Sequence, residues 1–219
     1  DLLTHLKMPF RDRNYRKLIS FLGVWNFAVN LAVPFFTVYM MKRLGMSMTS
    51  IMIMTILGQI ANLVFLGLWG KWADHFSNKS VLAVSGPLFL CTIFAWTFTS
   101  VADVNLFTWP LLALIHVAMG ASRAGVSLAT GNIGMKLAPR GEATVYLVAL
   151  SLSNALAAGS APIIGGKLAD MLVDNRFSFI LQWVSPQGSF IVQPINFRHW
   201  DFLFGIAFLA GLFALRLLK

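Results

Sequence analysis

The sequence predicts an all-α, polytopic membrane protein with six transmembrane helices, and three observations lead to this fold class. Hydrophobic residues make up 58% of the chain and charged residues only 11%, which is about half the charged share of a typical soluble domain. The apolar residues also form uninterrupted runs of about 20 residues, the length at which a helix crosses the bilayer core. The basic residues gather in alternate connections between these runs, as expected for a chain that crosses a membrane repeatedly.

Six apolar runs are predicted to span the membrane, and each contains at most one charged side chain. Residues 1–17 precede the first run as a basic, cytoplasmic lead-in. We expect this lead-in to be a surface-lying linker with a break at Pro9, because proline interrupts a helix. The predicted domains are therefore the lead-in at 1–17 and a six-helix bundle at 18–219. The runs are residues 18–41, 48–69, 81–102, 109–131, 143–166 and 202–218.

The Lys and Arg residues between the runs indicate how the chain is oriented. Eleven lie on the side that holds both termini, and five lie on the opposite side. By the positive-inside rule both termini are cytoplasmic. The net charge of +9 is then a matter of topology, and its expected partner is anionic membrane lipid and not nucleic acid. The eleven are Lys7, Arg11, Arg13, Arg16, Lys17, Lys71, Lys79, Lys136, Arg140, Arg216 and Lys219, and the five are Lys42, Arg43, Lys167, Arg176 and Arg198.

Strongly polar side chains inside the runs are confined to the first, second, fourth and fifth. The third and sixth runs contain no charged side chain, Asn, Gln or His between 82 and 101 or between 202 and 215. Placing Arg in the centre of a span costs ~2.5 to 3.5 kcal/mol on insertion scales. Runs one, two, four and five should therefore turn their polar faces inward, whereas runs three and six can face lipid. The candidate cavity residues are Asn26, Asn30, Gln59, Asn62, His116, Arg123 and Asn154.

Two roles remain open for these polar side chains. They can converge near the middle of the bilayer, where secondary transporters bind substrate. Alternatively, the amides can simply hydrogen-bond between helices and hold the bundle together. Arg123 is the strongest candidate for contact with substrate because its burial in lipid would cost most, and a single midplane cation points to an anionic or polar solute.

The longest connection, residues 168–199, is predicted to be extracytoplasmic and to contain a β-hairpin. The segments 177–184 and 190–197 are rich in aromatic and branched residues, which favour strands. Between them lies Ser-Pro-Gln-Gly at 185–188, a good turn sequence. We expect this hairpin to lie on the outer membrane face, either as a packed surface loop or as a lid.

The stretch at 70–79, GKWADHFSNK, is predicted to be a short polar loop on the cytoplasmic side. It resembles the signature loop of the major facilitator superfamily, G-x-x-x-D-R-x-G-R-R, at Gly70, Asp74 and Lys79, with His75 in place of the usual Arg. The resemblance implies that these four residues form a conformational switch. In this family the Asp docks on the start of the fifth helix of its half, here near residues 142–145, and closes the cytoplasmic side.

The segment GSAPIIGG at 159–166 resembles the G-P-x-x-G-G motif of antiporter members of the same family. Its Pro162, Gly165 and Gly166 are candidates for a helix kink, because proline leaves a backbone carbonyl without its usual partner.

A short internal repeat supports a particular arrangement of the six helices. The sequence GKWAD at 70–74 follows the second run and GKLAD at 166–170 follows the fifth. These copies fall on opposite sides of the predicted membrane, as in an inverted repeat of three plus three helices.

The segment PFRDRNYRKLI at 9–19 resembles the start of the seventh helix in bacterial members of the family. Together with the motifs above, it makes the chain similar to the C-terminal six-helix half of a major facilitator transporter. The resemblance implies a fragment of a secondary transporter in the plasma (inner) membrane, with 1–17 as the linker between halves. Its implied partners are a small-molecule substrate, membrane lipids and a missing N-terminal half, fused or separate.

A different class of function is also open, a self-contained six-span protein that dimerises or acts as an assembly scaffold without transport. An enzyme is not expected, because the sequence contains no zinc-protease, nucleotide-binding or serine-hydrolase motif. No cofactor or metal is expected either. The single cysteine, Cys91, excludes a disulfide framework, and we expect it to have an inert, apolar packing role in the middle of the third span.

Overall fold

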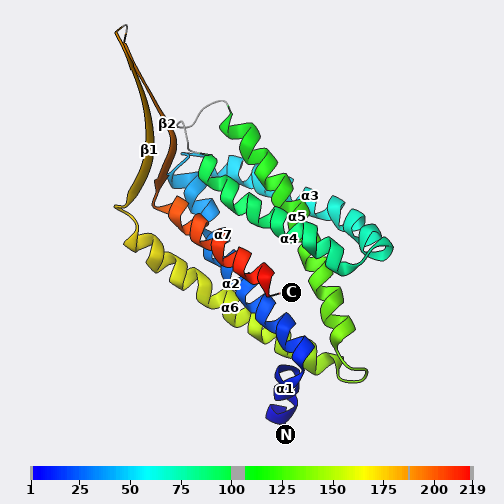
Figure 1. The fold of residues 1–219 in the computed structure, drawn as a ribbon. Coiled ribbons are helices and arrows are strands. Elements are labelled where there is room, and N and C mark those ends of the chain that lie inside the picture. The colour runs from blue at the N-terminus through cyan, green and yellow to red at the C-terminus, as the bar shows by residue number, and fades with distance from the viewer. Residues whose placement is uncertain (1, 100–106, 187, 218–219) are drawn as a thin grey trace.

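The structure is a computed structural model that describes residues 2–99, 107–186 and 188–217. Long helices form a bundle, and a two-stranded hairpin projects from the end remote from the N-terminus (Figure 1). This confirms the all-α membrane fold class. The elements are α1 (Leu2–Arg11), α2 (Arg13–Lys42), α3 (Met48–His75), α4 (Asn78–Ala95), the short 3-10 helix η1 (Trp96–Phe98), α5 (Thr108–Leu137), α6 (Ala143–Met171), β1 (Arg176–Ser185), β2 (Gly188–Arg198) and α7 (Trp200–Arg216).

The helices of the bundle correspond to the six predicted spans. Among the described residues, α2, α3, α4 with η1, α5 and α6 are long and apolar enough to cross a membrane. Helix α7 has 17 residues, which is at the short end of the range for a spanning helix. Residue 218 of the predicted sixth span and residues 100–102 of the predicted third span lie outside the described residues.

The packing of the helices follows the predicted inverted repeat. Helix α3 packs mainly on α5 and α6 mainly on α2, while α4 packs on α5, α7 packs on α2, and α4 contacts α7. Exchanging the first three spans (α2, α3, α4) with the last three (α5, α6, α7) leaves this set of contacts unchanged. The repeated GKxAD sequences occupy equivalent places, each within the last turns of α3 or α6. The arrangement therefore has the symmetry that three-plus-three repeats produce.

The start of the chain differs from the prediction in one respect. Helix α1 runs through Pro9 to Arg11, so the expected break at Pro9 is wrong. The break lies at Asp12, whose side chain accepts hydrogen bonds from the backbone N–H groups of Asn14 and Tyr15 and caps α2. A capping carboxylate satisfies N–H groups that have no partner within the helix.

The predicted polar loop at 70–79 is also mostly helical. Helix α3 continues to His75, only residues 76 and 77 lie between the helices, and Ser77 caps α4 through the backbone N–H of Ser80. The physical reason is that Lys71 and Asp74 are exposed and can reach water from the last turns of a helix. A polar sequence at a membrane surface therefore does not require a loop.

The share of buried residues differs among the helices. Helices α4 and α7, predicted to be able to face lipid, pack behind α5 and α2, and α4 is more buried than α3 or α6. Each keeps one exposed apolar face, which includes Leu88 on α4 and Leu209 on α7. Cys91 is exposed on α4, and its expected apolar packing role stays a prediction.

An aromatic cluster closes the core near the hairpin end of the bundle. The rings of Phe36 and Trp96 stack with centroids 4.4 Å apart, and Phe204 packs edge-on against Phe36 at 5.0 Å. The hydroxyl of Tyr39 lies 2.9 Å from that of Thr99. These contacts join α2, η1 and α7, so they position the half of the bundle that carries the hairpin.

The predicted hairpin is confirmed, with Ser185 paired to Gly188 across the turn. Strand β1 is exposed along almost its entire length, and large apolar side chains on it, such as Trp183 and Val184, are exposed.

Helices α3 and α5 approach each other closely at two glycines. A Cβ atom at Gly120 would overlap the carbonyl oxygen of Gly58, and one at Gly58 would lie 3.1 Å from the carbonyl oxygen of His116. The indole N–H of Trp69, further along α3, donates a hydrogen bond of 2.7 Å to the carbonyl oxygen of Ala121 on α5. Small residues allow such contact between helix backbones, and polar side chains then bond across it.

Replacing Trp69 with phenylalanine should lower the stability of the bundle modestly, because it removes this interhelical hydrogen bond and keeps most of the buried ring. Comparable bonds in membrane proteins contribute about 0.6 kcal/mol on average and at most about 1.7 kcal/mol. The measurement is thermal unfolding in detergent, with Trp72→Phe, at an exposed position on the same helix, as the control. An equal loss in both variants would contradict a role for the bond.

Candidate polar cavity

All seven polar residues predicted to line a cavity line one of two neighbouring cavities in the structure. The larger cavity, about 410 Å³, lies between α2, α5 and α6 and contains Asn26, Asn30, Arg123 and Asn154. The smaller, about 170 Å³, lies between α2, α3 and α5 and contains Gln59, Asn62, His116 and Arg123. Because Arg123, Met119 and Val33 line both, we treat the two as one polar groove.

The groove contains no side chain from α7 among the described residues, and α4 with η1 contributes only Phe89 and Trp96. These two aromatic residues form its apolar back wall. The four helices that the polarity of the sequence singled out are therefore those that surround the groove. The prediction that the third and sixth spans place no polar group there agrees with this arrangement.

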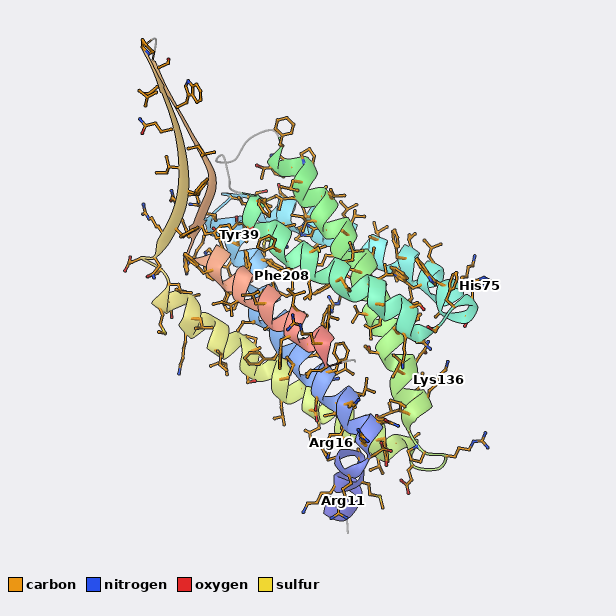
Figure 2. All side chains as sticks on the ribbon, in the orientation of Figure 1. Arg11, Arg16, Tyr39, His75, Lys136 and Phe208 are labelled. Atoms are coloured by element: carbon orange, nitrogen blue, oxygen red, sulfur yellow. The ribbon has the colours of Figure 1, made fainter. Side chains whose placement is uncertain are left out.

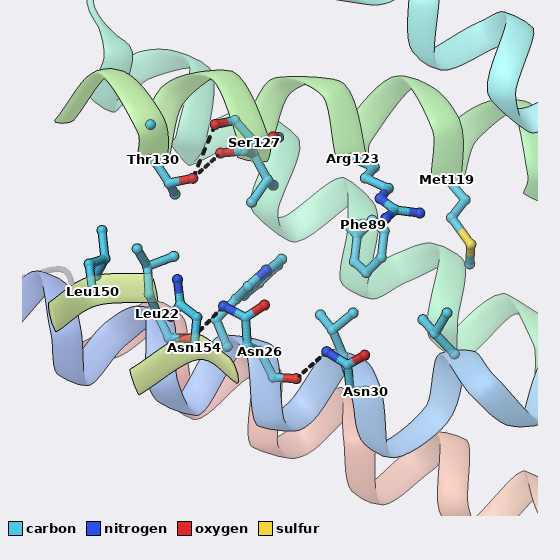
Figure 3. A pocket seen from close by; sticks show the side chains of 15 residues that line it. Leu22, Asn26, Asn30, Phe89, Met119, Arg123, Ser127, Thr130, Leu150 and Asn154 are labelled. Carbon is cyan, nitrogen blue, oxygen red and sulfur yellow. Dashed lines mark hydrogen bonds between the residues drawn. The ribbon is translucent and has the colours of Figure 1, made fainter. Parts of the chain in front are cut away.

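Arg123 lies at the centre of the groove, near the midpoint of α5. Figure 3 shows its side chain reaching from α5 into the space between α5 and α2, with Asn26 and Asn30 on the opposite wall. The side chain is exposed, and among the described residues it forms no hydrogen bond or ion pair. A guanidinium carries five donors and a permanent charge, so this group can receive a ligand.

The asparagines of α2 do not act as links between helices. The side-chain amide of Asn26 donates to the carbonyl oxygen of Leu22, and that of Asn30 donates to the carbonyl oxygen of Asn26, each at 2.8 Å (Figure 3). Both bonds lie within α2, which leaves the side-chain oxygens free to accept. Asn154 of α6 lies beside Asn26 on the same wall (Figure 3), and its side-chain oxygen is buried and has no hydrogen-bond partner among the described residues. A buried amide oxygen without a partner is costly, and water or a ligand in the groove would satisfy it.

Two of the predicted residues have structural partners. The amide of Asn62 donates to the carbonyl oxygen of Gly120 at 3.1 Å, which links α3 to α5. The ring of His116 bonds through Nδ1 to the carbonyl oxygen of Leu112 at 2.8 Å and packs edge-on against Trp96. Asn62 thus fulfils the alternative role of interhelical link, whereas Gln59 is exposed and forms no hydrogen bond within the described chain.

Several residues that line the larger cavity were not predicted from the sequence, including Ser127 and Thr130. Hydroxyl groups can bond to their own helix, as Thr130 does with the carbonyl oxygen of Val126 at 2.7 Å, so they carry little cost in lipid. Their spacing could have predicted them, because Ser127 and Thr130 follow Arg123 by four and seven residues and therefore share its helical face. Trp25, Phe89 and Met119 were missed because apolar side chains give no such signal.

The predicted switch residues lie at the same end of the bundle as the basic lead-in. Figure 2 shows Arg11, Arg16, His75 and Lys136 at helix ends remote from the hairpin. Asp74 is exposed and forms no hydrogen bond or ion pair with a described residue, so the expected docking on the start of α6 is absent from this conformation. Gly70 and Lys79 likewise contribute nothing to the groove, and the switch role of these residues stays a prediction.

The predicted kink residues have different roles. Helix α6 continues through Pro162 to Met171, so a kink at Pro162 stays a prediction. A Cβ atom at Gly165 would lie 2.9 Å from the carbonyl oxygen of Leu31 and 2.8 Å from the ring of Phe35. Gly165 therefore allows α6 to pack closely on α2, while Gly166 only adjoins the ring of Phe35.

The fold and the groove together define a helical, multi-pass membrane protein with a polar cavity near the middle of its helices. Residues 18–218 match the family model described as Major Facilitator Superfamily. The chain belongs to the Major Facilitator Superfamily and is a transporter of the major facilitator type. Comparison with curated proteins and with solved structures found no match.

Proposed function

We propose that the chain is the C-terminal six-helix half of a secondary active transporter that moves a small solute by alternating access. The observation that best supports this function is the convergence of seven polar side chains from four helices on one groove centred on Arg123. Polar surface of this kind is costly within a bilayer unless it meets water or a ligand. A groove near the middle of the helices is where secondary transporters bind substrate.

The charge in the groove favours a solute with a negative or hydrogen-bond-accepting group. Arg123 is the only charged residue among the described residues that line it, and the asparagine side chains on α2 and α6 supply further polar contacts. Carboxylate and phosphate groups match the planar donors of Arg. Substrate recognition would therefore begin with the guanidinium of Arg123.

A second six-helix half, fused or separate, would complete this site. Helices α3 and α6 bury the smallest share of their residues, and both flank the groove. Their exposed large apolar residues, such as Leu63 and Leu156, would pack on that second half. Transport would then proceed by rocking of one bundle against the other around the groove.

Cysteine labelling tests alternating access without knowledge of the substrate. Ser127 is exposed within the larger cavity, so Ser127→Cys places a thiol there in a protein whose only native cysteine is removed by Cys91→Ser. Alternating access predicts that a membrane-impermeant maleimide labels the introduced thiol in both right-side-out and inside-out vesicles. Labelling from a single side under all conditions would contradict the proposal.

A matched control distinguishes access through the groove from general leakiness. Leu209 is exposed on the outer face of α7 and does not line the groove. Leu209→Cys in the same background should face lipid and remain unlabelled from either side. Equal labelling of both positions would show that the membrane or the fold is compromised.

A further inference from the structure

A third cavity, separate from the polar groove, lies at the hairpin end of the bundle. It has a volume of about 310 Å³ and is bounded by the end of α2, the start of α7 and the base of the hairpin. No lining residue is shared with the groove. The lining contains four permanent cations, namely Lys42, Arg43, Arg176 and Arg198, and Asp201 as the single carboxylate among the described residues.

The hairpin brings two of these cations together. Arg176 on β1 is directly paired with Arg198 on β2. Like charges directly opposite each other on neighbouring strands are destabilising. Lys42 ends α2 and Arg43 caps it, so the end of a helix adds two more cations to the same cavity. The fold thus brings four cations from three elements together in one cavity.

The protein neutralises this charge only in part, because Asp201 interacts electrostatically with Arg43 and Arg198. Within the described chain no ion pair joins the four cations to a carboxylate, and the side chain of Arg198 donates to the neutral amide oxygen of Asn196. Asp201 accepts a hydrogen bond of 3.0 Å from the backbone N–H of Arg198 through Oδ2, whereas its Oδ1 is buried without a partner. Four cations against one carboxylate leave an excess of positive charge.

His199, beside the cluster, contributes a hydrogen-bond donor or acceptor and not a further charge. Burial lowers the pKa of its imidazole below the ordinary value, opposed by Asp170 and reinforced by Lys42, which favours the neutral ring. Its Nε2 is buried and has no hydrogen-bond partner. His199 also has a φ of 33°, a strained value for a residue other than glycine, and such strain is concentrated at functional sites.

We propose that this cavity binds a phosphate-type oxyanion, supplied either by the headgroup of an anionic lipid or by free phosphate. Guanidinium groups bind phosphate through paired, charge-assisted hydrogen bonds, and the cavity presents three of them with one ammonium. Binding would relieve the repulsion between Arg176 and Arg198. It would also tie the hairpin base to the ends of α2 and α7.

The first experiment measures the thermal stability of the full chain in two settings. In detergent stripped of anionic lipid, inorganic phosphate is added against chloride at equal ionic strength. In nanodiscs, phosphatidylglycerol is compared with phosphatidylcholine. Stabilisation by inorganic phosphate would support the site with free phosphate as a ligand, and stabilisation by phosphatidylglycerol alone would support it with a lipid headgroup as the ligand. No stabilisation in either setting would overturn the proposal.

Variants locate the effect. Arg176→Gln with Arg198→Gln should weaken the apparent affinity by about tenfold or more, whereas Lys136→Gln with Arg140→Gln, exposed cations outside the cavity, should leave it unchanged. Equal weakening in both pairs would indicate an adventitious effect of charge and would overturn the proposal.

A third variant should act in the opposite direction. Asp201→Asn removes the single carboxylate in the cavity and keeps an oxygen that can accept the hydrogen bond from Arg198, so the affinity should increase by about threefold to tenfold. This variant separates anion binding from misfolding, because a damaged fold would weaken binding. A weaker affinity in the folded Asp201→Asn protein would contradict the proposal.

Discussion

Replacing Arg123 with alanine should abolish transport while leaving the bundle folded. Arg123 is exposed in the groove and has no hydrogen bond or ion pair within the described chain, so its removal breaks no polar interaction of the fold. Hydrogen bonds to charged groups contribute about 1.5 to 3 kcal/mol, so binding of a solute that contacts the guanidinium should weaken roughly tenfold to a hundredfold. The measurement has two stages. Solutes that raise the melting temperature of the wild-type protein are identified first, and their uptake is then compared between wild-type and variant proteins.

Two controls sharpen this result. Arg123→Lys keeps the charge but loses the planar donors, so it should retain part of the binding. Lys136→Ala removes an exposed cation from the same helix but outside the groove, and it should not change uptake. A scaffold protein would behave differently, because Arg123→Ala would then impair folding or assembly. Unchanged uptake in Arg123→Ala would remove this residue from the site.

Replacing Gly120 with alanine should lower the stability of the bundle. The added methyl group would overlap the carbonyl oxygen of Gly58, which is backbone and cannot rotate away. Helices α3 and α5 would have to separate, which would strain the hydrogen bond from Asn62 to the carbonyl oxygen of Gly120. Overpacking typically costs about 1 to 3 kcal/mol, and thermal unfolding in detergent measures it.

The control is Gly67→Ala on α3, where an added Cβ atom has no neighbour within 4 Å. Alanine is the better helix former by about 1 kcal/mol, so this variant should be as stable as the wild-type protein or slightly more stable. If Gly120→Ala were equally harmless, the close crossing of α3 and α5 would not exist in the protein.

The positions of the spans and the helices that surround the groove could be predicted because the cost of polar groups in lipid is large and local. Asn30, Gln59, Arg123 and Asn154 are strongly polar within long apolar runs, and each must turn away from lipid. The groove unites them for this reason. The hairpin was predictable too, since its strands and its turn are neighbours along the chain.

Residues 70–75 illustrate where local sequence was insufficient. Their polarity indicates a position at the membrane surface, but it does not distinguish a loop from the last turns of a helix, and the structure shows helix. The sequence also could not predict that α4 is more buried than α6, because an apolar helix has the same sequence character whether it packs on another helix or on lipid.

The sequence by itself determined a six-span membrane protein with a polar face on four of its helices, because hydrophobic length and the cost of buried polarity are properties of each segment alone. Only the tertiary structure decided that Gly58 and Gly120 meet at a helix crossing, and that Arg176 and Arg198 converge with the end of α2 on one basic cavity. Contacts between segments far apart in the chain depend on packing geometry. No local pattern of residues records that geometry.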